Sequence, residues 1–388
     1  MKKDYEYIVL GLGGFGSAAA YWLSRRAGAE VLGLEQFELG HVRGESQDHS
    51  RIIRLSYHTP AYVELAKHAF GAWAQLEKDA GEQIVLKTGG LDFAPRVSAI
   101  PLTDYTGSMD AAGVPYEALD AGEIMRRWPP FRLTDDIHGL FQPESGIAMA
   151  ARGNAAHQRV AREQGASFQE RCQVEGVRRS RGEIAVTASG IEYRCRRLIV
   201  AAGSWSNRVL APFGVQLPLR VTQEQVTYFG TARPADFQPG RFPIWIWMDD
   251  PCFYGLPIFG EAGPKVGQHA GGQEVTADTR TFEPDRAALG RVQEFLGKYI
   301  PSALGPIIYT KSCLYTLTPD RDFVLDALPE HSDAFVAIGG GHGFKFASLI
   351  GRILSELAID GCTERNIEPF RINRPILHQA NPPKNYMV

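Results

Sequence analysis

The chain opens with a pattern of apolar and small residues that predicts a strand, a tight turn, a helix and a second strand. Residues 7–10 form an apolar run of strand length, and a glycine-rich loop follows directly at 11–16. Small and apolar residues of helical character occupy 17–26, and a second apolar run at 31–34 ends on Glu35. This order is typical of a βαβ unit that carries a glycine loop at its first turn.

The segment after Glu35 is polar and loop-like until Arg51. Arg51 and Arg54 are three residues apart, and we expect a helical turn that places them on one face. Thr59 and Pro60 then predict the start of a helix that runs to about residue 78, because proline is favoured at the first helical position.

The rest of the chain alternates between helix-like and strand-like patterns. Residues 84–147 have a mixed character, and residues 219–317 are rich in strand candidates with one helix between them, which predicts a second, antiparallel domain. Helices are expected at 121–128, 150–164, 286–299 and 344–359, and strands at 174–177, 184–188, 191–194, 198–202, 221–229, 242–248, 253–258 and 335–338.

Composition narrows the class of protein. The 388 residues are 44% hydrophobic and 22% charged, with a net charge of −3, so the totals are those of a globular protein and do not favour a nucleic-acid or anionic-membrane partner. No apolar run approaches the ~20 residues of a membrane span. The five cysteines lack metal-ligand or redox spacing, which suits a reducing compartment, and we expect a cytoplasmic protein.

The glycine loop has the spacing G-x-G-x-x-G, and each glycine has a physical reason. Gly11 permits the tight turn, Gly13 lets a pyrophosphate approach the backbone, and Gly16 lets the helix pack on the sheet. The helix N-terminus offers unpaired N–H groups to phosphates, and Glu35 can accept hydrogen bonds from ribose hydroxyls. The unit therefore predicts an ADP-containing dinucleotide, without separating NAD from FAD.

Several further segments occur in the order and spacing of one flavoprotein family. They are Ser50-Arg51-Ile52-Ile53-Arg54, Ala201-Ala202-Gly203-Ser204-Trp205, Tyr254-Gly255-Leu256-Pro257, Gly263-Pro264-Lys265-Val266-Gly267-Gln268-His269, Cys313-Leu314-Tyr315-Thr316 and Gly341-His342-Gly343-Phe344-Lys345-Phe346. With the glycine loop, they resemble the monomeric sarcosine oxidase and N-methyltryptophan oxidase family over essentially the whole chain. The cysteine segment and the late glycine-histidine segment are the most specific.

The resemblance implies an α/β fold with two domains. Residues 1–83, 148–218 and 318–388 would form a Rossmann-type FAD-binding domain of glutathione-reductase type. Residues 84–147 and 219–317 would form an α+β substrate domain with a mainly antiparallel sheet. The implied reaction is oxidation of a secondary, N-substituted amino acid: hydride passes from the amine carbon to FAD, O2 reoxidises the flavin to give H2O2, and the imine product hydrolyses. The implied partners are a small amino acid and O2, and the implied state is a monomer.

The resemblance also assigns candidate site residues. Catalytic roles fall on Lys265, Arg51, His269 and Tyr254, with Lys265 as the cation that activates O2. Arg54 and Lys345 would bind the substrate carboxylate, while Tyr254, Trp245 and Gln47 would shape the pocket, with Tyr315 as a further lining candidate. The cofactor would contact Gly11, Gly13, Gly14, Phe15, Gly16, Glu35, Gln36, Arg43, Ser46, Ser50, Arg51, Ile52, Val174, Ala202, Gly203, Trp205, Gly341, His342, Gly343, Phe344 and Lys345, with a covalent bond to Cys313.

Two positions depart from the family pattern. Gln47 replaces a histidine four residues before Arg51, and the stretch around Trp245 and Trp247 replaces a methionine that lines a small pocket. Both changes argue against sarcosine as the best substrate and favour a bulkier N-substituted amino acid in an aromatic-lined pocket.

Other readings of the same residues remain. The glycine loop also suits a nicotinamide-dependent dehydrogenase, and the chain could be a flavoprotein acting on another amine class or a flavin-binding protein without catalysis. Cys313 could be an ordinary buried cysteine, and Lys265 a solvated hairpin lysine. A metal site is not expected, because His41, His49 and His58 lack a ligand-spaced cysteine or a clear carboxylate partner.

Overall fold

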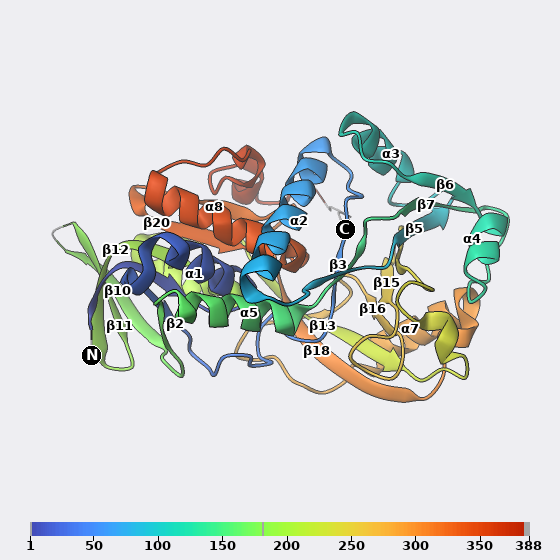
Figure 1. The fold of residues 1–388 in the computed structure, drawn as a ribbon, viewed down its shortest axis with the longest axis horizontal. Coiled ribbons are helices and arrows are strands. Elements are labelled where there is room, and N and C mark those ends of the chain that lie inside the picture. Colours follow the sequence, from blue (N-terminus) through green and yellow to red (C-terminus); the bar gives the residue numbers. More distant parts are fainter. Residues whose placement is uncertain (1, 181, 384–388) are drawn as a thin grey trace.

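The computed structural model describes residues 2–180 and 182–383, and three sheets organise it (Figure 1). The first is an eight-stranded mixed sheet in which β1 lies between β2 and β12, parallel to both. Its members are β1 (Asp4–Leu10), β2 (Val31–Leu34), β9 (Ser167–Gln169), β10 (Val174–Ser180), β11 (Glu183–Ala188), β12 (Ile191–Val200), β19 (Val324–Leu328) and β20 (His331–Ile338).

Four helices gather over one face of this sheet: α1 (Gly14–Ala27), α2 (Pro60–Ala80), α5 (Ala150–Glu163) and α8 (Ala347–Asp360) (Figure 1). The α1 and α8 backbones approach closely, since a Cβ on Gly351 would lie 2.4 Å from the carbonyl carbon of Ala18. Helix α2 begins as its sequence predicts: Pro60 is the first residue, and the Thr59 side chain accepts a hydrogen bond from the Tyr62 amide.

The second sheet has nine strands and is antiparallel except where β5 runs parallel to β14. Helices α4 (Ala121–Arg127) and α7 (Arg286–Tyr299) lie beside it, and α3 (Leu102–Ala111) contacts α2. The strands are β5 (Gly90–Pro95), β6 (Glu117–Asp120), β7 (Ile137–Gln142), β13 (Arg220–Phe229), β14 (Ile244–Trp247), β15 (Phe253–Leu256), β16 (Lys265–Gln268), β17 (Gln273–Val275) and β18 (Ile307–Leu317).

A small third sheet joins the two large ones through β3 (Arg51–Ile53), β4 (Val85–Lys87) and β8 (Gly146–Ala148). It corrects the expectation of a helical turn around Arg51 and Arg54. The two isoleucines between them pair with β8 in an extended conformation, and residues three apart in a strand point to opposite sides.

The α/β fold class is confirmed, with a Rossmann-type unit and a mainly antiparallel second sheet. The helices expected at 150–164 and 286–299 are present within a residue, α8 begins only at Ala347 after a 3-10 turn, and α3 was missed. The nine-stranded sheet draws on residues 90–142 and 220–317, while the boundaries between two domains stay a prediction. No helix within the described ranges is long and apolar enough to cross a bilayer.

Candidate active site

A large cavity opens where the parallel strands of the first sheet end and the second sheet begins. Its wall takes residues from the carboxyl ends of β1, β2, β12 and β20, which is where α/β sheets bind their ligands. The cavity encloses about 1700 Å³, including its open mouth.

The glycine loop forms one part of this wall, and its geometry requires glycine. Gly11 has φ +85°, and a Cβ there would lie 2.6 Å from the Ala201 carbonyl oxygen. A Cβ on Gly16 would lie 1.7 Å from the Gly11 oxygen, so Gly16 packs beneath the loop instead of lining the cavity. Helix α1 therefore begins at the cavity with a glycine N-cap and no side-chain cap, as an anion site needs.

Glu35 ends β2 at the same cavity and is held in place by three contacts. Its carboxylate accepts hydrogen bonds from the amides of Leu12 at 2.8 Å and Phe37 at 3.1 Å, and it lies 3.4 Å from the His41 ring. Glu35 follows β2 and lies on the same cavity wall as the N-terminus of α1. The carboxylate is therefore placed to bind the ribose of a dinucleotide, and the helix N-terminus to bind its phosphates.

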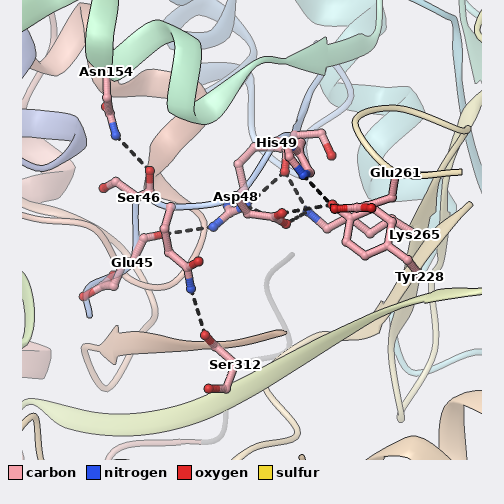
Figure 2. A network of polar contacts seen from close by, with 12 residues as sticks. Glu45, Ser46, Asp48, His49, Asn154, Tyr228, Glu261, Lys265 and Ser312 are labelled. Carbon is pink, nitrogen blue, oxygen red and sulfur yellow. Dashed lines mark hydrogen bonds and ion pairs between the residues drawn. The ribbon is translucent and has the colours of Figure 1, made fainter. Parts of the chain in front are cut away.

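The far side of the cavity contains a buried cation, Lys265, at the start of β16 (Figure 2). Its ammonium donates to the Asp48 carboxylate at 2.6 Å and to the Ser50 carbonyl at 2.7 Å. The Tyr228 hydroxyl donates to the other Asp48 oxygen at 3.0 Å, and Arg51 lies 3.6 Å from Asp48. Two cations therefore share one carboxylate.

This arrangement shifts the titration of both partners. Burial lowers the pKa of Lys265 to about 8. Arg51 lowers this pKa further, whereas Asp48 raises it, and the lowering effects are larger. Burial alone would raise the pKa of Asp48, but Lys265 and Arg51 outweigh it and hold that pKa below its ordinary value. Asp48 is thus an ionised carboxylate at neutral pH.

Asp48 is the main residue of this site that the sequence reasoning missed. Its φ of 87° is unusual for a non-glycine residue, and its carbonyl accepts the Ala151 amide at 3.0 Å at the start of α5. Ala150 bonds the His49 carbonyl in the same way, and Asn154 bonds the Ser46 carbonyl. The polar run before Arg51 was the sequence signal that could have indicated Asp48. This run is a loop whose carbonyls cap the start of α5 and whose Asp48 side chain binds Lys265.

A second cation, Lys345, lines the same cavity as Tyr254 and His269. None of residues 2–180 and 182–383 forms a hydrogen bond or ion pair with the Lys345 ammonium, which lies 5.7 Å from the centre of the Tyr57 ring. Burial and the nearby Arg54 lower its pKa well below the ordinary value, with Asp92 acting in the opposite direction.

Arg54 differs from its expected place, because it does not line the cavity. It is 1% exposed, and its guanidinium pairs with both oxygens of Asp92, at 3.1 and 3.2 Å. The rings of Tyr57 and Tyr105 lie against it at 4.9 and 5.7 Å. Arg54 therefore lies behind the wall with Asp92 as its ion-pair partner, and direct carboxylate binding by Arg54 stays a prediction.

Comparison with known proteins agrees with this geometry. The family model for FAD dependent oxidoreductases matches residues 6–357. The chain belongs to that family. Its relatives include the monomeric sarcosine oxidase of Arthrobacter sp. (strain TE1826), 32% identical over 98% of both chains. The N-methyl-L-tryptophan oxidase of Escherichia coli O139:H28 is 31% identical over 95% of this chain and 99% of its own.

Solved structures extend the likeness to the fold. NikD, described as an unusual amino acid oxidase essential for nikkomycin biosynthesis, superposes with a TM-score of 0.84 at 24% identity, covering 95% of this chain and 98% of its own. The L-proline dehydrogenase from P. horikoshii gives 0.83 at 22% identity, covering 96% and 97%. The family model and the relatives therefore confirm the family resemblance predicted from the sequence. They do not support the alternative of a nicotinamide-dependent dehydrogenase.

The residues present fit FAD. The glycine cradle, the Glu35 acid and the buried Lys265 belong to one continuous cavity. The predicted cofactor and catalytic residues on its wall are Gly11, Gly13, Gly14, Phe15, Glu35, Gln36, Ser46, Ser50, Arg51, Ile52, Val174, Ala202, Gly203, Trp205, Tyr254, Lys265, His269, Gly341, His342, Gly343, Phe344 and Lys345. Tyr315 lines it as well. Gly16, Arg43 and Cys313 are not on the wall.

Cys313 lies on β18 two residues from Tyr315, so both side chains point to the same face of the sheet. It is buried, and burial raises the pKa of its thiol to about 11, with Arg51 opposing that rise. The thiol is therefore protonated at neutral pH in the protein as it stands.

The two departures from the family pattern act differently from what we expected. Trp245 lies on the opposite face of β14 from the cavity, stacked on Phe295 of α7 at 5.5 Å, and Ile246 lines the wall. Gln47 does not line the cavity, and its amide donates to the Ser312 carbonyl at 2.8 Å. The alternation of side chains along β14 explains the error, and the prediction of a tryptophan-narrowed pocket loses its basis.

Proposed function

We propose that this protein is a flavin-dependent oxidase of N-substituted amino acids that uses O2 as its electron acceptor. The observation that carries the proposal is that one cavity contains both a dinucleotide cradle and the buried ammonium of Lys345, which has no ion-pair partner within the described part of the chain. The named relatives oxidise sarcosine or N-methyl-L-tryptophan, and both are N-substituted amino acids with a carboxylate. A carboxylate is the group that a buried ammonium selects.

FAD would be held by the amides of α1 at its phosphates and by Glu35 at its ribose. When bound, it supplies a two-electron acceptor that takes a hydride from the carbon beside the amine nitrogen and passes the electrons to O2. The chain itself provides binding, orientation and electrostatics.

Lys345 would fix the substrate carboxylate, and a fixed carboxylate orients the amine-bearing carbon. Ile246, Tyr254 and Leu256 form the apolar wall beside it and exclude water. Lys265, held by Asp48, would place a positive charge where O2 gains electrons, and such a charge is worth more in a dry site than in water.

Cys313 would link covalently to the flavin. The thioether would join Cys313 Sγ to the flavin 8α carbon at the cost of one S–H and one C–H bond, and O2 would take up the two hydrogens as H2O2. The charge of Arg51 supports the proposal, because it lowers the pKa of the Cys313 thiol against the effect of burial and so favours the thiolate. Acid precipitation tests it: yellow colour in the pellet is expected, and colour wholly in the supernatant would refute the linkage.

A substrate panel tests the function as a whole. Purified protein mixed anaerobically with secondary amino acids is expected to lose the visible absorbance of its oxidised flavin. Admission of O2 should restore the absorbance and release H2O2. Primary amines and amines without a carboxylate should react far more slowly, and equal reaction with both classes would exclude this function.

The remaining expectations, a monomer and a cytoplasmic location, stand as proposals. The proposed location rests on the five scattered cysteines, whose spacing in the sequence is neither that of metal ligands nor that of a redox pair. Sedimentation of the holoenzyme would establish the oligomeric state.

A further inference from the structure

Arg280, in the loop 276–285 between β17 and α7, makes a set of contacts that the proposed function does not use. One terminal nitrogen of its guanidinium donates to the carbonyls of Arg43 at 2.9 Å and Val42 at 3.5 Å. The other donates to the hydroxyl of Ser312 at 2.8 Å and to its carbonyl at 3.3 Å. The Nε atom donates to the Thr281 carbonyl at 3.3 Å, so each N–H of the planar fork has an acceptor. The side chain therefore ties two distant segments to its own loop.

The loop that carries Arg280 is itself held in place. The amide of Thr276 donates to the Thr279 hydroxyl at 2.9 Å, and the amide of Thr279 donates to the Thr276 hydroxyl at 3.0 Å. The Arg280 amide then donates to the Thr276 carbonyl at 3.1 Å. On the next residue, the Thr281 amide donates to the Gln223 side chain at 2.7 Å. Because Gln223 lies on β13, which pairs with β18, the loop is anchored beside the strand that Arg280 contacts.

The two segments that Arg280 ties together are the cofactor wall and the strand that carries the thiol. The first belongs to residues 41–47, the cofactor segment, which contributes to the cavity wall His41, Gly44, Glu45 and Ser46. The second is Ser312, which directly precedes Cys313 on β18. The guanidinium lies outside the cavity wall, and it acts on the cavity through these neighbours.

The cofactor segment is joined to β18 at two further places, one on each side of Cys313. The Gln47 amide donates to the Ser312 carbonyl at 2.8 Å, and the Thr316 hydroxyl donates to the Glu45 carboxylate. Figure 2 shows Ser312 on its strand below Glu45. Among the described strands β18 pairs with β13 alone, so the cofactor segment lies along its other edge. The position of Cys313 relative to the cavity therefore depends on how this segment and β18 are held together.

The charge of Arg280 also acts on the thiol. Burial lowers the pKa of Arg280, and Cys313 acts in the opposite direction, which means that the guanidinium and a thiolate attract each other. An arginine stays protonated under these conditions, and a nearby cation favours the thiolate, which is the reactive form of cysteine.

We propose that Arg280 is a positioning residue for covalent flavin attachment: by tying the cofactor segment to Ser312, it holds Cys313 Sγ at the flavin 8α carbon. The proposal rests on the function and the linkage proposed above. In the step that Arg280 serves, one S–H and one C–H bond break, the S–C bond forms, and O2 takes up the two hydrogens as H2O2. Such a step depends on how well the two reacting atoms are held, so loss of the tie slows it.

The rate of flavin attachment tests the proposal without turnover of any amino acid. The full chain, produced under riboflavin limitation, is mixed with FAD in air and precipitated with acid at intervals, and the flavin in the pellet measures the linkage. Arg280→Met keeps the apolar stem and removes the donors, and it should slow linkage about tenfold to a hundredfold. Arg280→Lys keeps the charge but loses the planar fork, so it should be slowed to a similar extent. Arg286→Met, at an exposed position of α7, is the matched control and should link at the wild-type rate.

Ser312→Ala approaches the same contact from its other end and keeps the proposal testable if Arg280→Met fails to fold. It removes the hydroxyl that accepts the shortest of the Arg280 hydrogen bonds and leaves the carbonyl in place, so linkage should slow a few-fold. In the double variant Arg280→Met/Ser312→Ala the two losses should not add, because each change removes the same contact.

Three results would overturn the proposal: wild-type linkage in Arg280→Met, wild-type linkage in Arg280→Lys or Ser312→Ala, or losses that add in the double variant. A wild-type rate in Arg280→Lys would show that charge alone suffices. Failure of the proposed function is recognised separately, because it appears in the wild type itself. Colour wholly in the supernatant of the wild type refutes the linkage and with it the role of Arg280, and an absence of anaerobic flavin reduction by any secondary amino acid refutes the oxidase.

Discussion

The cavity has two buried ion pairs on its flanks, and they are built in opposite ways. In the first, the cation Lys265 lies on the cavity wall and its partner Asp48 lies behind it. In the second, Arg54 and Asp92 both lie behind the wall, and a separate cation, Lys345, faces the cavity. The first pair presents a charge that already has a counter-ion, whereas Lys345 on the second side has no counter-ion among residues 2–180 and 182–383.

This difference teaches what each cation can do. Lys265 is held by two hydrogen bonds whether or not a ligand is present, so its position is fixed in advance, as electrostatic catalysis requires. Lys345 lacks such an anchor among the described residues, and burial lowers its pKa, so its charged form is stabilised when a carboxylate arrives. One cation suits catalysis and the other suits binding.

The largest expected effect comes from removing the pre-paired cation. Lys265→Met should slow reoxidation of the reduced flavin by O2 roughly 10²–10³-fold, the size typical for loss of one preorganised electrostatic contact. Anaerobic reduction by substrate should change far less, because hydride transfer creates no new anion beside Lys265. Stopped-flow measurement of the two half-reactions separates the steps.

The matched control for this variant is Lys298→Met on the surface helix α7, which should leave both half-reactions as they are. Equal slowing of the two halves by Lys265→Met would assign this lysine to substrate binding instead, and the contrast between the two cations would then disappear.

Removal of the counter-ion behind Lys265 should cost stability as well as charge. Asp48→Asn leaves a buried ammonium without its carboxylate, and breaking such a pair lowers the free energy of unfolding by about 3–5 kcal/mol. The surface pair Lys2–Glu30 offers a comparison, since Glu30→Gln should cost about 1 kcal/mol or less. Chemical denaturation of the holoenzyme measures both, and equal losses would show that the Asp48 pair is solvated.

Much of this fold was predictable because its signals are local. The glycine loop, the strands beside it and the proline at the start of α2 depend on residues close in sequence, and each was found where expected. The positions of Arg54 and Trp245 and the contacts of Asp48 could not be predicted for one shared reason: they depend on which side of a strand a residue occupies and on partners far away in the chain. Asp92 is 38 residues from Arg54, and nothing near either residue indicates the pair.

The pH dependence should distinguish the two cations by a smaller effect. Because the pKa of Lys265 is about 8, its charge is present below pH 8 and is lost above it. The rate of reoxidation should therefore be constant at lower pH and fall about tenfold per pH unit above about 8. In Asp48→Asn the effect of burial and Arg51 remains without the carboxylate, so the fall should begin at lower pH. A profile that is flat to pH 10 in the wild type would exclude Lys265 as the group that titrates.

The smallest expected effects test the alternation of side chains along β14. Ile246 and Trp245 are neighbours on β14, but Ile246 lines the cavity and Trp245 packs on α7. Ile246→Val should change KM for the best amino acid a few-fold and cost about 0.5–1.5 kcal/mol in stability. Trp245→Phe should lower the free energy of unfolding by about 1–3 kcal/mol through lost packing and leave KM unchanged. Steady-state kinetics and thermal unfolding of both variants decide the matter. If Trp245→Phe changed KM while Ile246→Val did not, the cavity face of the sheet would be assigned wrongly.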